Sequence, residues 1–155
     1  MKCIALALSL LVAGSTASAQ HMEKWGYPDP DVFAKAALSL CDEQNLSVML
    51  AARHRDQGRT REDVMALIPP KSKVIELRAL EAYRENVEDV FDFPNIGTYS
   101  LMVFRAEVCR REVMAAKTYP RFETVRVKVT ACEEQHGKEK SNALYACVRT
   151  VVDSM

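Results

Sequence analysis

The chain has 155 residues, of which 48% are hydrophobic, and its 21 basic and 21 acidic side chains give a formal net charge of zero. This length is enough for one domain with a sizeable core. Because nucleic-acid binding depends on neutralising phosphates with excess positive charge, the balanced charge argues against a nucleic-acid partner.

The first nineteen residues differ from everything that comes after them. Lys2 is the only charged residue there, Ile4 to Val12 form an apolar run, and Ala17-Ser18-Ala19 is a small-residue cleavage site. This order is typical of a secretory signal peptide over residues 1–19. The run is too short to span a membrane, which takes about 20 apolar residues. We expect cleavage after Ala19 to leave 136 of the 155 residues, without a transmembrane segment, in the periplasm or secreted.

Residues 20–30 are predicted to be an irregular lead-in, and residues 31–155 a single helical domain. Pro30 follows Asp29, a good N-cap, and opens a helix expected to run to about Gln57 and to stop at Gly58. Thr60 and Asp63 then resemble the capping box of a short helix that ends at Pro69-Pro70.

Two further helices are predicted from apolar spacing. One should begin near Ser72 and end before Phe93-Pro94, because its apolar residues recur at gaps of three or four: Leu80, Tyr83, Val87 and Val90. The next is marked by Leu101, Phe104 and Val108 and carries Cys109.

The segment 121–132 fits two kinds of structure. Val125, Val127 and Val129 alternate with polar residues as in a strand, whereas Phe122, Val125, Val129 and Cys132 have helical spacing. We favour the helix, because a lone strand would need a partner and no other segment alternates convincingly. Gly137 closes this element and Ser141 caps a last helix. The predicted fold is therefore all-α, a single compact bundle of about five or six helices.

Four cysteines remain after cleavage, and an even count in an exported chain predicts two disulfides. Cys132 and Cys147 would stand at matching heights on antiparallel helices, on either side of the turn near Gly137. This favours pairing Cys132 with Cys147, and by elimination Cys41 with Cys109. The alternative is a metal site, because Cys132 and His136 are four residues apart and would share a helix face. With three histidines in the chain and no CxxC or HxxxH, we predict neither a metal nor a cofactor.

No segment predicts a catalytic residue. His54 and Asp56 are two positions apart on a helix and do not face each other. The adjacent carboxylates Glu88-Asp89 and Glu133-Glu134 are expected to be solvated. Four methionines stand singly and are expected to fill the core rather than to bind a soft metal: Met49, Met65, Met102 and Met114.

Four arginines surround the turn at Gly58, namely Arg53, Arg55, Arg59 and Arg61. A DNA-reading helix-turn-helix would place Arg61, Glu62 and Asp63 on the bases, so two acids would face an anionic groove. We interpret the arginines instead as a solvated helix end with partners in Asp56, Glu62 and Asp63, and expect no nucleic-acid binding.

Four features follow one another in a recognisable order: a cysteine at position 41, the motif Arg55-Asp56-x-Gly58, an aromatic residue (Phe91 or Phe93) before Pro94, and Cys109. Between Cys41 and Cys109, roughly half of the mature chain, this order resembles small exported helical bacterial proteins in which a cysteine pair ties two helices. The resemblance implies a helical, disulfide-tied exported protein and supplies no activity.

The remaining expectation is a binding role. Trp25 and Tyr27 are large amphipathic side chains of the kind that anchor a protein partner, although packing back over the bundle is the favoured interpretation. A charge-mixed helix face could also meet a partner but is expected to be solvated: Arg105, Glu107, Arg110, Arg111 and Glu112. We therefore expect a non-catalytic binding, inhibitor, immunity-type or accessory factor of the envelope. The alternatives are an extracytoplasmic enzyme with a site not visible in the sequence, or a metal-binding periplasmic protein.

Overall fold

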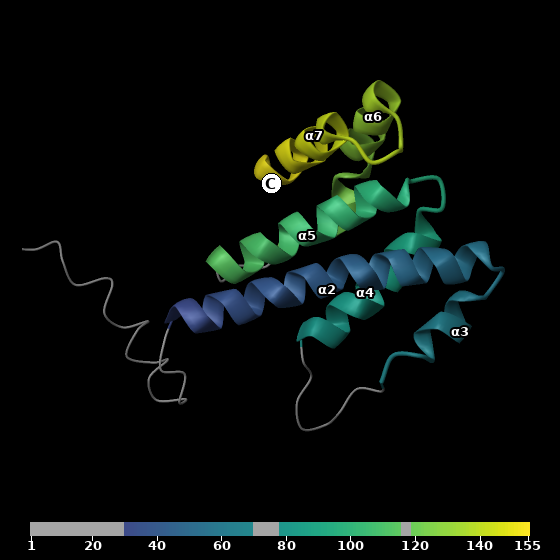
Figure 1. The fold of residues 1–155 in the computed structure, drawn as a ribbon. Helices are drawn as coiled ribbons and strands as arrows, with labels where there is room; N and C mark the ends of the chain where they lie inside the picture. The colour runs from purple at the N-terminus through teal and green to yellow at the C-terminus, as the bar shows by residue number, and fades with distance from the viewer. Residues whose placement is uncertain (1–29, 70–77, 116–118) are drawn as a thin grey trace, which may run out of the picture. The chain divides into compact units, whose positions relative to one another are not determined.

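Helices make up all the regular structure of the described residues. The computed structural model describes residues 30–69, 78–115 and 119–155, so the expected signal peptide and residues 20–29 of the expected lead-in lie outside it (Figure 1). The chain divides into two units, Met1–Lys35 and Ala36–Met155, and the hydrophobic core belongs to the second. The elements are α2 (Pro30–Asp56), α3 (Arg61–Met65), α4 (Arg78–Asp92), α5 (Thr98–Ala115), the 3-10 turn η1 (Phe122–Thr124), α6 (Arg126–His136) and α7 (Asn142–Asp153). The predicted all-α fold tied by two disulfides is confirmed.

The end of α2 lies where the glycine signal predicts it. Gly58 adopts a φ of 79°, a left-handed conformation in which a side chain would be strained. Its N–H donates to the carbonyl of Arg55 at 2.8 Å, and the N–H of Arg59 donates to the carbonyl of His54 at 3.1 Å. These two bonds satisfy the last carbonyls of α2 and reverse the chain toward α3.

The predicted capping box at the start of α3 is confirmed. The N–H of Asp63 donates to Thr60 Oγ1 at 3.1 Å, and the N–H of Thr60 donates to Asp63 Oδ2 at 3.2 Å. The helix itself is shorter than predicted, since it ends at Met65 and continues to Ile68 as hydrogen-bonded turns. The predicted helix start near Ser72 lies outside the described residues.

The capping box gives a pH-dependent expectation. Hydrogen bonds from Thr60 lower the pKa of the Asp63 carboxyl below its ordinary 3.8, and the positive charge of Arg59 acts in the same direction. Its contribution to stability is therefore complete above pH 3.8 and is lost as the pH falls through the lowered value. NMR titration should place the Asp63 midpoint below 3.8, and Thr60→Val should return it toward 3.8 while Thr60→Ser should not. An unchanged midpoint in Thr60→Val would contradict this cause.

Helix α5 lies between the α6–α7 hairpin and α4 (Figure 1). Its inward side carries Leu101 and Phe104, which are almost completely buried, and Phe104 meets Phe122 of η1 edge to face at 5.1 Å. The core continues into α4 and α7 through the fully buried Val90, Leu144, Val148 and Val152. No helix of the described residues is both long enough and apolar enough to cross a membrane.

The segment after residue 121 is helical, as favoured from its spacing. Val125 and Val129 are buried at 4% and 0%, whereas Val127 between them is 74% exposed. A strand would place all three on one face, so burial follows the helical period. Ser141 caps α7 by accepting the N–H of Leu144 at 3.1 Å, as predicted.

Both predicted disulfides are present. Cys132 and Cys147 join α6 to α7 across a Cα–Cα distance of 5.8 Å, and Cys41 and Cys109 join α2 to α5 across 5.4 Å. The matching heights on the antiparallel hairpin therefore indicated the correct pairing.

A buried carboxylate fixes the turn before α5. The N–H of Gly97 donates to Glu133 Oε1 at 2.8 Å, and the Glu133 side chain is 3% exposed. A Cβ at position 97 would lie 3.0 Å from that oxygen, so glycine lets the backbone approach the acceptor. The expectation that Glu133 is solvated is wrong, because the carboxylate serves a backbone group of another segment.

Replacing this acceptor should destabilise the fold. Glu133→Ala leaves the Gly97 N–H without its partner, and we expect the free energy of unfolding to fall by about 1.5–3 kcal/mol, the range for a hydrogen bond to a charged group. Urea denaturation measures it. Glu133→Gln keeps an acceptor of the same shape and should lose less. Equal losses in the two variants would contradict the acceptor as the cause, because glutamine keeps both the acceptor oxygen and the volume and lacks only the charge.

Candidate functional site

Most of the large apolar side chains that face solvent lie close together. Within residues 30–69, 78–115 and 119–155, six such side chains are exposed, and four of them belong to α2 or to the turn after α3. These four are Leu46 (54% exposed), Met49 (44%), Leu50 (48%) and Leu67 (59%). We call them the α2–α3 face. Single exposed apolar residues are ordinary, but a contiguous group of them marks a contact surface.

An apolar groove runs beside this face. It has a volume of about 470 Å³, and Leu46, Leu50 and Leu67 form part of its lining. Its deepest residues are the buried Ala51, Val64 and Val87, which come from α2, α3 and α4. Three helices thus supply the groove, while the half-exposed leucines leave it open to solvent.

The local sequence explains why α2 presents these side chains. Residues 41, 48, 51 and 52 lie on the buried side of the helix, with exposed fractions of 0–3%. Leu46, Met49 and Leu50 are spaced by three and four on the other side, so they share a second stripe. α2 is therefore apolar on two sides, and only one of them is covered by the core.

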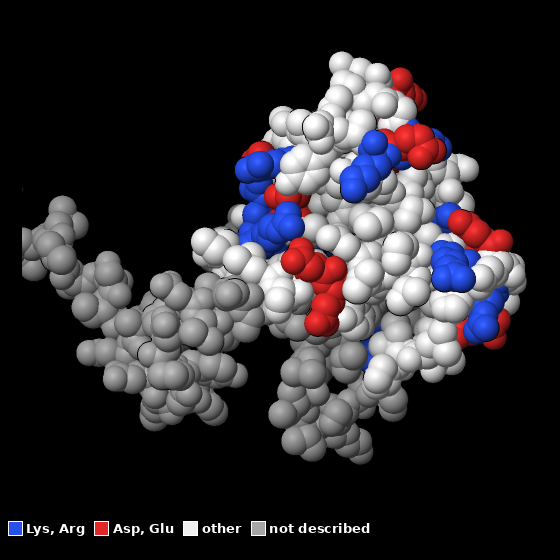
Figure 2. Space-filling view, viewed as in Figure 1, with Lys and Arg blue, Asp and Glu red and all other residues white. Residues whose placement is uncertain are grey.

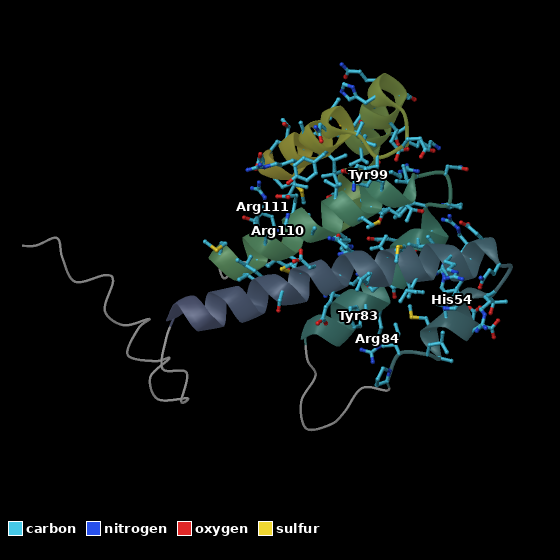
Figure 3. All side chains as sticks on the ribbon, in the orientation of Figure 1. His54, Tyr83, Arg84, Tyr99, Arg110 and Arg111 are labelled. Atoms are coloured by element: carbon cyan, nitrogen blue, oxygen red, sulfur yellow. A yellow bond between two sulfur atoms is a disulfide. The ribbon has the colours of Figure 1, made fainter. Side chains whose placement is uncertain are left out.

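Polar groups lie at both ends of the groove. Tyr83 of α4 donates its hydroxyl to Glu43 Oε2 at 3.2 Å, and burial, followed by this carboxylate, raises the pKa of Tyr83 above 10.0. At the other end His54 lies near the end of α2 (Figure 3). Its Nδ1 is buried and has no hydrogen-bond partner among the described residues. The groove is thus an apolar channel with a carboxylate at one end and an imidazole at the other.

A second, charged cavity of about 350 Å³ lies between α4, α5 and the segment after α5. Its central group is Arg105, which is 6% exposed and forms ion pairs with Asp89 and, at 3.0 Å, with Glu85. Arg121 pairs with Glu88 at 2.6 Å and lies 3.8 Å from Asp89. These charges satisfy one another, so the cavity is a structural ion-pair network rather than the better candidate for a site.

Several charged side chains expected in solvent are buried instead. Arg105 and Glu107 were expected on a solvated face, but both are 6% exposed. Glu107 accepts hydrogen bonds from Tyr145 at 2.7 Å and from Arg110 at 2.8 Å, and so joins α5 to α7. Asp89 is 3% exposed and is likewise not solvated. In each case an opposite charge or a hydroxyl from another segment allows the group to be buried.

Two of the four arginines around Gly58 take part in the fold's own contacts. Arg55 donates to Asp56 at 3.0 Å and to the carbonyl of Val90 at 3.0 Å, and Arg61 pairs with Asp92 of α4. Figure 2 shows acidic and basic side chains intermixed in small groups on the viewed face, without a patch of one sign. Neither observation supports nucleic-acid binding.

The other predicted site residues have different outcomes. Trp25 and Tyr27 lie outside the described residues, so their role stays a prediction. All four cysteines of the described residues are in disulfides, and Cys132 is therefore no thiolate beside His136. The described part of the chain holds no group of three His, Cys, Asp or Glu side chains placed to bind a metal.

The α2–α3 face was missed by the sequence interpretation. Met49 was expected in the core together with Met114, but they are 44% and 73% exposed, whereas the other two of the four, Met65 and Met102, pack against the core. The available signal was the apolar spacing of residues 46, 49 and 50, which is out of step with the buried positions of the same helix.

The fold and this face define an all-α, disulfide-tied protein with an open apolar groove. No protein-family model, curated protein or solved structure matches the chain.

Proposed function

We propose that the chain is an exported, non-catalytic binding protein of the envelope, of the inhibitor, immunity or accessory type, and that it binds its partner through the α2–α3 face. The observation that carries the proposal is the set of four exposed apolar side chains beside an open groove, Leu46, Met49, Leu50 and Leu67. Clustered apolar side chains of this kind give up water on binding and supply most of an interface's free energy.

Two further features support an extracytoplasmic, binding role. Disulfides persist in oxidising compartments, and two of them tie the helices together. The helix that carries most of the face is anchored by Cys41 near its middle and by the Gly58 turn after its last residue. A rigid surface loses little conformational entropy on binding, which favours a binding protein.

Export has a direct test. The order of Lys2, the apolar run and Ala17-Ser18-Ala19 predicts a mature protein that begins at Gln20. Intact mass measured on protein from the periplasmic fraction and the medium should give this start. A protein found only in the cytoplasm with its first residues intact would contradict the proposal.

The binding surface is tested with matched variants. The mature, oxidised protein is used to capture partners from envelope extract, together with Leu50→Glu and, as a control, Val127→Glu. Both positions are exposed helix residues, so both variants should fold. We expect a partner that Val127→Glu retains and that Leu50→Glu binds at least about tenfold more weakly, because an introduced carboxylate cannot be buried without a partner.

A third variant tests the lead-in. The double substitution Trp25→Ala and Tyr27→Ala should weaken capture if these side chains anchor the partner as well. Capture that survives both this change and Leu50→Glu would refute the α2–α3 face as the contact surface.

A further inference from the structure

The outer side of α2 carries charge in a fixed order. Asp42 and Glu43 come before the apolar residues of the stripe, and Arg53 and His54 come after them. Eleven positions separate the acidic end from the basic end, about 16 Å at roughly 1.5 Å per residue. The same side of the helix therefore has an acidic end, an apolar middle and a basic end.

This charge order is complementary to that of an antiparallel copy of the same helix. Residues equally distant from position 48 form the pairs Asp42 with His54, Glu43 with Arg53, and Leu46 with Leu50. When two copies of one helix pack antiparallel about a two-fold axis at position 48, these residues lie level with each other across the contact. Each acidic end then meets a basic end, and leucine meets leucine.

The groups involved have capacity for a further partner. Arg53 is exposed, and neither its side chain nor that of His54 has a hydrogen bond or ion pair with another described residue. Asp42 has a single long contact, to Arg110 at 3.4 Å, and is 71% exposed. Glu43 accepts the Tyr83 hydroxyl and has its other oxygen available. The carboxylates of Asp42 and Glu43 and the guanidinium of Arg53 can therefore be paired by another molecule without breaking the core.

We propose that the α2–α3 face binds a second copy of this chain, with α2 antiparallel to the partner's α2 about a two-fold axis near residue 48. The inference rests on the proposed function, because it uses the same face and names the partner. A two-fold contact is isologous, so the pair closes on itself and does not grow into a filament. Leu67, on the far side of the groove, extends the apolar contact beyond α2.

The charge order favours a second copy over an unrelated partner. An apolar groove alone would accept many amphipathic helices. Here the required helix, with its basic end opposite Glu43 and its acidic end opposite Arg53, is α2 itself. Like charges would meet in a parallel pair, so the same order also selects the antiparallel direction.

Charge exchange tests the pairing. In Glu43→Lys, each introduced lysine would face Arg53 of the other copy, and in Arg53→Glu, each introduced glutamate would face Glu43. We expect the wild type to form a dimer in sedimentation velocity experiments over a concentration series. We expect each single variant to dissociate at a concentration at least about tenfold higher, since like charges then meet at both ends. Both positions are exposed, so circular dichroism should be unchanged.

Mixing the two single variants gives the decisive result. In a mixed pair, the introduced lysine faces the introduced glutamate at one end, and the remaining Arg53 faces the remaining Glu43 at the other. The mixture should therefore form a heterodimer as tight as the wild type, whereas neither variant dimerises well alone. Val127→Glu should dimerise normally and Leu50→Glu should not.

Three results would overturn the inference: a wild type that is monomeric throughout the series, a dimer unaffected by both charge variants, or a mixture that fails to recover. The failure of the inference can be told apart from the failure of the proposed function. A monomer whose capture of an envelope protein depends on Leu50 refutes the second copy and leaves the proposed function standing. If the protein dimerises but captures no other protein, the α2–α3 face serves only for self-association.

Discussion

Replacing Cys41 and Cys109 together by alanine should lower the free energy of unfolding by about 4.4 kcal/mol. The two cysteines are 68 residues apart, and in the chain-entropy model a cross-link stabilises by restricting the unfolded chain, the more so the longer the loop. Replacing Cys132 and Cys147, 15 residues apart, should cost about 3 kcal/mol. Urea denaturation of the two double variants, each keeping its other disulfide, measures both values.

The order of these two losses is the informative result. Alanine is chosen because Cys41 and Cys132 are almost completely buried, and a polar replacement would add a cost of its own. A larger loss from the short loop would show that the cross-links act mainly through local packing and not through the unfolded chain.

Arg105→Met should destabilise the protein by about 3–5 kcal/mol, the range for breaking a buried ion pair by removing one partner. Arg105 and Asp89 are 6% and 5% exposed at their side chains, so the variant leaves a buried carboxylate without its main counter-charge. Adding Asp89→Asn should recover part of the loss, because the uncompensated charge is gone. The double variant should therefore be more stable than Arg105→Met alone, in the same urea titration.

The pH dependence of this variant is set by the sign of the Asp89 shift. Burial raises the pKa of the Asp89 carboxyl above 3.8, while the positive charge of Arg105 opposes the rise. Protonation of Asp89 is therefore more favourable in the folded chain than in the unfolded chain, and the stability that this contributes is complete below pH 3.8 and is lost as the pH rises through the raised value. Without Arg105, nothing from that side chain opposes the rise in the pKa of Asp89, so more stability is lost as the pH rises. The deficit of Arg105→Met should therefore be greater at pH 7 than at pH 4, and a deficit independent of pH would contradict the electrostatic cause.

Local chemical signals predicted the helix ends well. The Gly58 turn, the Thr60–Asp63 capping box and the Ser141 cap each depend on residues within a few positions of one another. The disulfide pairing was also accessible, because two helices joined by a short turn fix the relative heights of Cys132 and Cys147.

Burial of charged residues could not be predicted in the same way. Arg105, Asp89 and Glu133 are buried because partners from other segments satisfy them, and those contacts arise only in the folded chain. The exposed stripe of α2 was missed for a related reason. A helix that is apolar on two sides has no single direction of burial in its sequence, and only packing decides whether Val48 or Leu50 faces the core.

The cross-link between Cys41 and Cys109 also has a consequence for resistance to proteases. A single cut anywhere between these residues opens the backbone but releases no fragment, because the disulfide still joins the two pieces. All four residues of the α2–α3 face lie inside this closed loop, and the α6–α7 hairpin is closed in the same way. Between Cys41 and Cys147, a cut separates two covalently independent pieces only in residues 109–132. Such a cut would leave the whole face on the N-terminal piece, so native electrophoresis without reductant after limited digestion would report whether that piece still associates.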